Sequence, residues 1–381
     1  MKDKIAQTFD NLFGSRPIVA FAPGRINLIG EHTDYQEGLV FPAAIEQGIW
    51  VGIQQNELSS CRLYSTDFEE EFVFDINSFS PKKGHWANYT MGMVSQFQQA
   101  GYNLKNFDLA FGGNIPASGL SSSAALSVAI GTALTALFQL NIPKKSLVLY
   151  AQKSEHLFAG VKCGIMDPYA SAFGVKNRAL LLDCRSNTHL EIAAEFANHS
   201  LLLVNSKVKH NLADSAYNKR REACEESVRL IQKSYPKAIT LRDIPVKDLE
   251  KVKQILPEDL FPKAKHVITE INRVKLASNV LKNNDLNAFG ALLKESHRSL
   301  SEDFEVSCVE LDYLAEQSWE MPGVLGSRMM GGGFGGCTIN LISNAHLDKF
   351  QSEIYTKFKS KFQIEADFIP VALSQGARIL A

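Results

Sequence analysis

The spacing of apolar residues predicts a mixed α+β fold in the first half of the chain. Short apolar or alternating runs predict strands at 18–22, 39–43, 49–54, 62–65, 107–111 and 180–183. Repeats at helical spacing predict helices at 86–100, 123–140 and 145–158, and a short amphipathic helix at 1–14. Strands and helices therefore interleave along the chain.

A change of pattern near residue 190 predicts a second domain. A strand-like run, LLLVNS, follows at 201–206, and helical patterns then dominate to about residue 320. Strand character returns at TINLI and DFIPVAL. The 381 residues also exceed the size at which a single core stops growing. We therefore expect two closely packed domains, 1–190 and 191–381, with a cleft between them.

Charge and cysteine content narrow the functional classes. Forty basic residues offset 41 acidic ones without long runs of one sign, which argues against nucleic acid or a membrane surface as partner. The six cysteines are scattered, as free thiols of a reducing compartment would be. The uncharged stretch 109–143 is long enough to span a bilayer, but it holds Gly112, Gly113, Pro116 and four serines before its helical part begins, so we expect a buried core helix there. Without a signal-peptide core in the first 14 residues, we expect a cytoplasmic protein.

Two glycine-rich segments are candidates for ligand contact. In IPASGLSSSAAL, at 115–126, small residues precede an apolar helix, and the free N–H groups of its first turn could bind a phosphate. A serine that only caps the core helix is an equally weighted alternative. No Gly-Lys-Ser/Thr ends this segment, so it is not a Walker A loop. MMGGGFGGCTINL, at 329–341, contains G-x-G-x-x-G, but the strand-like run after it argues against a dinucleotide fold. We expect a loop that approaches a ligand closely, or else a tight packing turn.

Charged residues in apolar surroundings are candidates for chemistry. Arg25, Glu31, His32 and Asp34 lie within the segment 24–38, between two apolar runs; an ion-paired surface turn is the alternative.

Further along, Glu155 lies toward the inner side of the helix expected at 145–158, although a solvated surface glutamate is the commoner case. Asp167 before Pro168 is typical of a helix start, with aspartate at the N-cap and proline at the first position. Its apolar neighbours would also suit a general base.

Three motifs together resemble a known family. GRINLIGEHTDY resembles the signature of galactokinases, and GLSSSAAL and MMGGGFGGCTI resemble motifs shared by the GHMP small-molecule kinases. The resemblance continues through WANY, LLDCRS, SAYNKRREACE, ESHRSLSEDFEVS and SQGA, and so covers essentially the whole chain. It implies an N-terminal domain similar to ribosomal protein S5 domain 2, a C-terminal ferredoxin-like α/β domain, and an active site between them.

The resemblance implies ATP-dependent phosphorylation of the C1 hydroxyl of D-galactose, the entry step of galactose (Leloir) metabolism, giving α-D-galactose 1-phosphate and ADP. It implies that Asp167 is the general base and that Arg25 stabilises charge on the transferred phosphoryl group. The implied substrate-binding residues are Glu31, His32, Thr33, Asp34, Asp167 and Tyr217. The implied ATP contacts are Ser65, Trp86, Ala117, Ser118, Gly119, Leu120, Ser121, Ser122 and Ser123. Ser123 and Glu155 would hold Mg²⁺.

One departure leaves sugar specificity open. Galactokinases commonly have glutamine after the catalytic aspartate, and here that residue is Pro168. Two alternatives are kept beside the phosphorylation of galactose: a GHMP kinase for another sugar such as N-acetylgalactosamine, because one sequence does not display the shape of the sugar pocket, and a galactose and ATP sensor without catalysis. The expected protein is a monomer, with a homodimer as the alternative.

Overall fold

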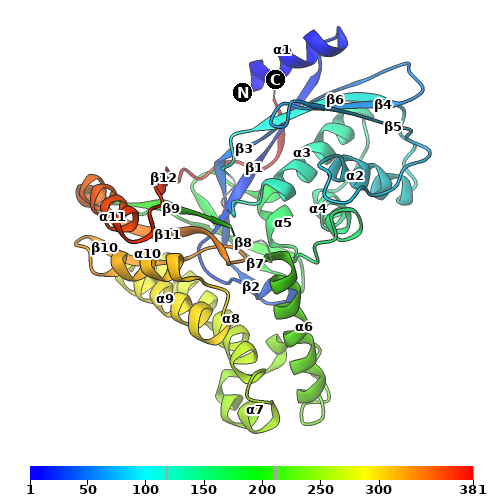
Figure 1. The fold of residues 1–381 in the computed structure, drawn as a ribbon. Coiled ribbons are helices and arrows are strands. Elements are labelled where there is room, and N and C mark those ends of the chain that lie inside the picture. The colour runs from blue at the N-terminus through cyan, green and yellow to red at the C-terminus, as the bar shows by residue number, and fades with distance from the viewer. Residues whose placement is uncertain (117–118, 210–212, 381) are drawn as a thin grey trace.

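The computed structural model describes residues 1–116, 119–209 and 213–380. A six-stranded sheet carries the first half, in the order β13-β1-β3-β6-β4-β5, with β4 and β6 parallel and the other neighbours antiparallel. Its strands are β1 (Ile18–Asn27), β3 (Pro42–Gln55), β4 (Cys61–Ser65), β5 (Glu70–Phe74), β6 (Phe107–Gly113) and β13 (Arg378–Leu380). The last strand returns the C-terminal end of the chain to the N-terminal sheet (Figure 1).

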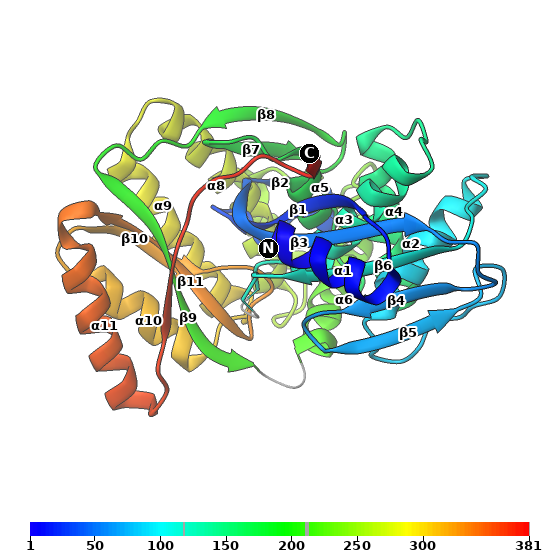
Figure 2. The same cartoon turned by 90° about the horizontal axis from the view of Figure 1, so that it is seen from above.

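Helices cover both faces of this sheet. The amphipathic α1 (Lys2–Phe13) lies on one face and buries Ile5 and Phe9 (Figure 2). The other face carries α2 (Ala87–Gln99), α3 (Ser122–Leu137), α4 (Lys144–Ser154) and α5 (Met166–Phe173). Because α3 is apolar on nearly all sides, it is buried between the sheet and its neighbouring helices. This arrangement fixes the first turn of α3 beside the end of β1.

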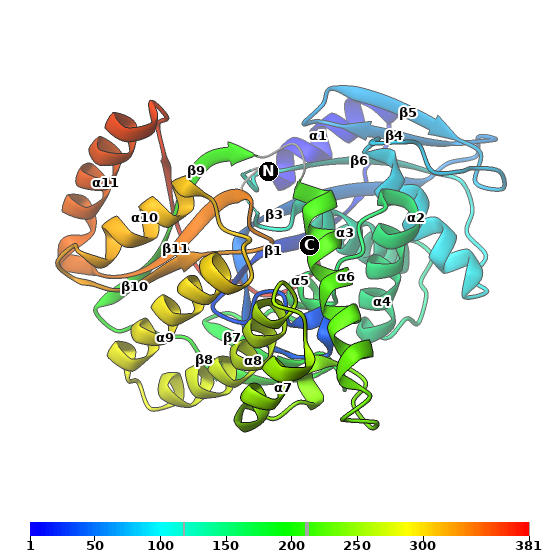
Figure 3. The same ribbon diagram turned by 60° about the horizontal axis from the view of Figure 1, so that its bottom comes forward.

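The second half has a four-stranded antiparallel sheet in the order β10-β11-β9-β12. Its strands are β9 (His199–Lys209), β10 (Val324–Met329), β11 (Gly335–Ser343) and β12 (Asp367–Pro370). The accompanying helices are α6 (Ala213–Ile231), α7 (Leu249–Ile255), α8 (Phe261–Lys282), α9 (Leu286–Arg298), α10 (Val309–Trp319) and α11 (Leu347–Phe362). In Figure 3, α8 and α9 lie side by side below this sheet.

Smaller elements join the two halves. A three-stranded sheet consists of β2 (Leu39–Val40), β7 (Arg178–Asp183) and β8 (Thr188–Ala193). The short 3₁₀ turns are η1 (Asp34–Gln36), η3 (Leu241–Asp243), η4 (Val246–Asp248) and η6 (Asn344–His346), and the π turns are η2 (Glu155–Ala159) and η5 (Ser299–Asp303). One buried apolar cluster runs from the 26–45 segment into α8 and α9, so the halves share a core.

The predicted fold class is confirmed, and several predicted element ends are corrected. The strand expected at 39–43 is interrupted at Phe41, and the helix expected to reach residue 140 ends at Leu137. DFIPVAL forms a strand only over Asp367–Pro370. The division at residue 190 stays a prediction. Among the described helices, none combines the length and the apolar character that crossing a bilayer requires, and 109–143 contains the end of β6 and all of α3.

The predicted start of α5 is wrong. Ile165 is the N-cap, so Asp167 and Pro168 occupy the second and third helical positions. Proline fits there for the same reason as at the first position: the N–H groups of the first helical turn have no partner within the helix. The Asp167 carboxylate therefore lies at the positive end of α5 instead of capping it.

Candidate active site

The end of β1 brings residues 24–35, the GRINLIGEHTDY motif that we call the sugar-signature segment, against the start of α3. A Cβ on Gly24 would lie 2.7 Å from the Leu120 carbonyl oxygen, so only glycine allows this approach. Next to it, the Arg25 backbone N–H donates to the same carbonyl at 3.1 Å. The glycine of the predicted motif thus fixes the distance between Arg25 and the predicted phosphate loop.

Arg25 and Asp167 form a bidentate ion pair across 142 residues of sequence. The Arg25 Nε and Nη2 atoms donate to the two carboxylate oxygens at 2.8 and 2.9 Å, and Nη1 donates to the Gly119 carbonyl at 2.6 Å. The Ser121 hydroxyl also donates to Asp167. The Asp167 side chain keeps 26% of its surface exposed. Three donors among the described residues therefore leave one of its four lone-pair positions open toward the cavity.

Glu155 is buried beside this pair. It begins the π turn that follows α4, which turns its side chain inward, where Ser123 and Cys163 hydrogen-bond to it. Burial and the nearby Asp167 charge raise the pKa of the Glu155 carboxyl to about 7. Two carboxylates and the Ser123 hydroxyl thus share one small space, which favours a cation between them.

Asp34 lies against the 164–166 segment that precedes Asp167. Its carboxylate accepts hydrogen bonds from the Tyr35 and Met166 N–H groups at 2.9 and 3.4 Å. Burial and the Asp167 charge raise its pKa to about 6. A Cβ on Gly164 would lie 1.8 Å from its Oδ2 atom, so Gly164 admits the aspartate.

His32 is held neutral in one orientation. Its φ of 62° is left-handed, and its ring packs 4.8 Å from Phe304 and 5.1 Å from Tyr217, between centroids. The Nε2 atom lies 3.1 Å from the Gly332 carbonyl oxygen and Nδ1 lies 2.9 Å from the Tyr35 hydroxyl. Burial lowers its pKa to about 3. Since a carbonyl can only accept, Nε2 carries the proton and Nδ1 accepts from Tyr35.

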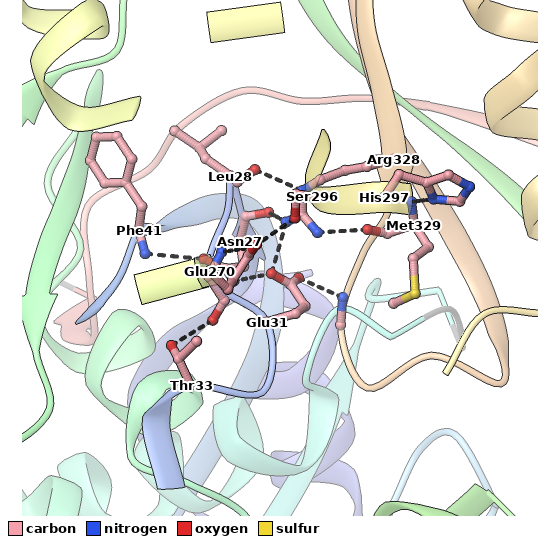
Figure 4. A network of polar contacts seen from close by, with 12 residues as sticks. Asn27, Leu28, Glu31, Thr33, Phe41, Glu270, Ser296, His297, Arg328 and Met329 are labelled. Carbon is pink, nitrogen blue, oxygen red and sulfur yellow. Dashed lines mark hydrogen bonds and ion pairs between the residues drawn. The ribbon is translucent and has the colours of Figure 1, made fainter. Parts of the chain in front are cut away.

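Glu31 is almost completely buried, with 1% of its surface exposed. Its Oε1 atom accepts from the Gly331 N–H at 2.8 Å, and Oε2 accepts from Arg328 at 2.9 Å and from Asn27 (Figure 4). Burial raises the pKa of this carboxyl, but the Arg328 charge and the N–H donors favour its ionised form. Glu31 therefore joins the sugar-signature segment to the glycine-rich loop.

These side chains meet in a cavity of about 270 Å³. Its lining brings together predicted residues from both halves: Arg25, Glu31, His32, Asp34, Ser123, Glu155, Asp167 and Tyr217. It also includes residues 331–334 of the glycine-rich loop, and four residues to which the sequence analysis gave no role: Val161, Cys163, Gly164 and Met166. The expectation that this loop approaches a site closely agrees with its place in the wall, and β11 follows it instead of a helix.

Other predicted residues lie outside this lining. The Thr33 hydroxyl is buried and donates to the Gly30 and Leu39 carbonyls at 3.0 and 2.8 Å, which fixes the turn. Ser65 is buried in β4, and the Trp86 indole donates to Glu70 at 2.6 Å.

In the predicted phosphate loop, Ala117 and Ser118 lie outside the described residues. Gly119 and Leu120 contribute carbonyls to Arg25, Ser121 has a left-handed φ of 58°, and Ser122 is exposed.

Three family models match the chain. Residues 7–55 match the galactokinase galactose-binding signature, 88–175 the N-terminal domain of GHMP kinases, and 276–360 their C-terminal domain. A galactokinase of Fusobacterium nucleatum is 40% identical over 94% of this chain and 93% of its own length. The chain belongs to the galactokinase family. Galactokinases of Enterococcus faecalis and Bacillus subtilis are 39% and 36% identical, the first over the full length of both chains and the second over 100% of this chain and 99% of its own.

The solved structures agree with this family. The Lactococcus lactis galactokinase, crystallised with galactose, superposes with a TM-score of 0.96 at 35% identity, covering 99% of each chain. A mevalonate kinase structure, at 18% identity, covers 93% of this chain and 99% of its own with a TM-score of 0.63, which shows the shared GHMP fold alone. This galactokinase-family protein is accordingly a sugar kinase, a phosphotransferase with an alcohol group as acceptor and ATP as donor.

Proposed function

We propose that the protein transfers the γ-phosphoryl group of ATP to the C1 hydroxyl of D-galactose, giving α-D-galactose 1-phosphate and ADP. This is the entry step of galactose metabolism. The observation that carries the proposal is the bidentate Arg25–Asp167 pair, which joins the sugar-signature segment to α5 beside the N-terminal turn of α3. Asp167, Arg25 and Ser123 of the first turn of α3 line one cavity, which supports these residues as base, cation and part of the phosphate site.

Asp167 and Arg25 have complementary tasks in this reaction. The open lone pair of Asp167 accepts the proton of the C1 hydroxyl as the oxygen attacks phosphorus. The Arg25 guanidinium offsets the negative charge that spreads over the transferred group. Because Arg25 is also tied to Gly119, the geometry is preset before substrate arrives, and catalysis rests mainly on positioning.

The residues present fit a nucleotide and one Mg²⁺ ion. No three His, Cys, Asp or Glu side chains cluster as a complete metal site in residues 1–116, 119–209 and 213–380. Mg²⁺ fits a site with only two protein ligands, because it commonly takes one or two protein oxygens and completes its shell with phosphate oxygens and water. We assign these two oxygens to Ser123 and Glu155. When bound, the ion supplies charge neutralisation on the phosphates.

The sugar would meet a wall of directional partners. Glu31 and Asp34 accept hydrogen bonds, and Tyr217 both donates and accepts. His32 orders this wall through Tyr35 and Gly332. Each buried hydroxyl left without a partner costs about 1–3 kcal/mol, which is enough to discriminate between epimers.

We also propose that the protein acts as a monomer in the cytoplasm. Free thiols at all six cysteines support a reducing compartment. Light scattering of the purified protein separates a monomer from the alternative homodimer.

The deciding experiment measures ADP release from Mg²⁺ and ATP with a panel of sugars: D-galactose, glucose, talose, 2-deoxygalactose and N-acetylgalactosamine. We expect rapid turnover with D-galactose and the formation of α-D-galactose 1-phosphate. Turnover with N-acetylgalactosamine instead would reassign the substrate. Galactose and ATP binding without turnover would identify a sensor.

A further inference from the structure

The sugar-signature segment is held by buried charged side chains that do not line the cavity. Arg328, at the end of β10, has 0% of its surface exposed. Its Nε donates to the Leu28 carbonyl at 2.8 Å, Nη1 to the Met329 carbonyl at 2.6 Å, and Nη2 to the Asn27 carbonyl and the Glu31 carboxylate (Figure 4). Three of these four acceptors belong to the 27–31 segment.

Glu270, from the middle of α8, holds the same segment as an acceptor: Arg328 donates to backbone carbonyls, whereas Glu270 accepts from a backbone N–H. Its Oε1 atom accepts from the Gly30 backbone N–H at 2.9 Å and from Ser296 at 2.6 Å, and Oε2 accepts from Arg273 at 2.6 Å. Although burial raises the pKa of this carboxyl, the Arg273 charge and further positive partners lower it to about 2. Glu270 is therefore a fixed anion facing a backbone N–H.

The backbone between these contacts is an unusual one. Gly30 has a φ of 106°, and a Cβ there would lie 2.8 Å from a methyl carbon of Val274. The His32 φ of 62° is also left-handed. A left-handed backbone is costly for a residue that carries a side chain, as His32 does, so it persists when surrounding contacts determine it. Arg328 and Glu270 supply those contacts from two different elements, β10 and α8.

A gain in protein stability does not by itself explain why charged residues are buried at positions 270 and 328. Replacing buried ion pairs by apolar residues of similar volume is often neutral or stabilising, because desolvation of the charges offsets their attraction. An apolar side chain could not satisfy the Asn27 and Leu28 carbonyls or orient Glu31. With Gly331 and Asn27, Arg328 occupies three of the four lone-pair positions of Glu31 and leaves one, on Oε1, unused by the described residues.

We propose that Arg328 and Glu270 are positioning residues for sugar recognition. They fix the 27–32 backbone and direct the remaining lone pair of Glu31 toward a sugar hydroxyl. Neither side chain is part of the cavity lining, so both act through the segment they hold. The inference rests on the proposed function, since it assigns the sugar to this cavity.

The test compares Arg328→Lys and Glu270→Gln with a matched control, Arg62→Lys. Arg62 forms a bidentate pair with the buried Asp108 in the N-terminal sheet, at 2.7 and 2.8 Å, and contacts no residue of the 27–32 segment. We expect both positioning variants to raise the galactose Kd by calorimetry, and the galactose KM, by about tenfold or more, as for one weakened charge-assisted hydrogen bond. The KM for ATP should stay within about twofold, and the control should change neither constant.

A double-mutant cycle identifies the route of the effect. If Arg328 acts through Glu31, adding Arg328→Lys to Glu31→Gln should raise the galactose Kd far less than it does in the wild type. The proposal would be overturned if the fold-changes in galactose Kd of the two single variants multiplied in the double variant. It would also be overturned if the variants lost active enzyme while the galactose Kd and KM stayed unchanged. Should Arg328→Lys fail to fold, the same cycle with Glu270→Gln decides.

The wild-type protein separates the two proposals. Galactose binding without turnover would refute the proposed function and still allow the calorimetric cycle. A wild type that neither binds nor phosphorylates galactose would refute both.

Discussion

The buried Glu155 carboxyl provides a sharp test of the metal assignment, through the substitution Glu155→Gln. Only 7% of this residue is exposed, and burial together with the Asp167 charge raises its pKa from 4.5 to about 7. Glutamine keeps the shape and removes the charge. If the carboxylate is retained for Mg²⁺, its removal should stabilise the metal-free protein while abolishing the response to the ion.

The size and sign of the effect follow from the pKa. A group whose pKa is raised by folding stabilises the folded state below the unfolded pKa, near 4.5, and this stabilisation is lost as pH rises through 7. A shift of this size corresponds to about 3 kcal/mol between the two limits. The free energy of unfolding of Glu155→Gln, relative to wild type, should therefore increase by roughly 2–3 kcal/mol between pH 5 and pH 8.

Urea denaturation at pH 5 and pH 8, in EDTA, measures this difference. Glu258→Gln is the matched control, because Glu258 is exposed in the turn between α7 and α8. At pH 8, Mg²⁺ with ADP should stabilise the wild type and the control more than Glu155→Gln. If the free energy of unfolding changed equally with pH in the wild type and in Glu155→Gln, folding would not raise the pKa of Glu155. An undiminished Mg²⁺ response in the variant would remove it from the metal site.

Three further substitutions test the site. Asp167→Asn should lower kcat roughly 10²–10⁴-fold while leaving the galactose Kd within a few-fold, measured by steady-state kinetics and calorimetry; near-normal turnover would exclude Asp167 as the base. Gly164→Ala should raise the galactose KM about tenfold, because its Cβ would lie 1.8 Å from the Asp34 carboxylate, and an unchanged KM would show that Asp34 does not contact the sugar. Trp86→Phe removes the bond to Glu70 and should raise the KM for ATP about fivefold with no change for galactose; an unchanged ATP constant would exclude a nucleotide role.

The sequence was informative where chemistry depends on short motifs. Arg25, Glu31, His32 and Asp34 lie within ten residues, so their grouping needs no knowledge of the tertiary fold. Bringing Asp167 to Arg25 requires the packing of α3 and α5 against β1, which apolar periodicity does not specify. The family resemblance was therefore needed to bring the two together.

Other features have no local signal. Thr33 occurs inside the sugar signature, yet its hydroxyl is used by the turn, so proximity in sequence did not distinguish a structural role from a ligand contact. Arg328 directly precedes the glycine-rich segment and has no pattern of its own, because its partners Leu28 and Glu31 lie about 300 positions away. Such a residue emerges only when its hydrogen bonds are traced through the core.

Asp167 and Glu31, two of the three carboxylates that would meet the sugar, share a property that bears on specificity. Described donors occupy three of the four lone-pair positions of Asp167, and likewise of Glu31. Each carboxylate can then accept one more hydrogen bond, in one direction. A hydroxyl turned to the other face of the sugar ring would lose its partner and leave that position unfilled, at a cost of about 1–3 kcal/mol. Because protein donors fill three of the four positions, each carboxylate accepts a sugar hydroxyl from one direction only, and this makes binding depend on the stereochemistry of the sugar.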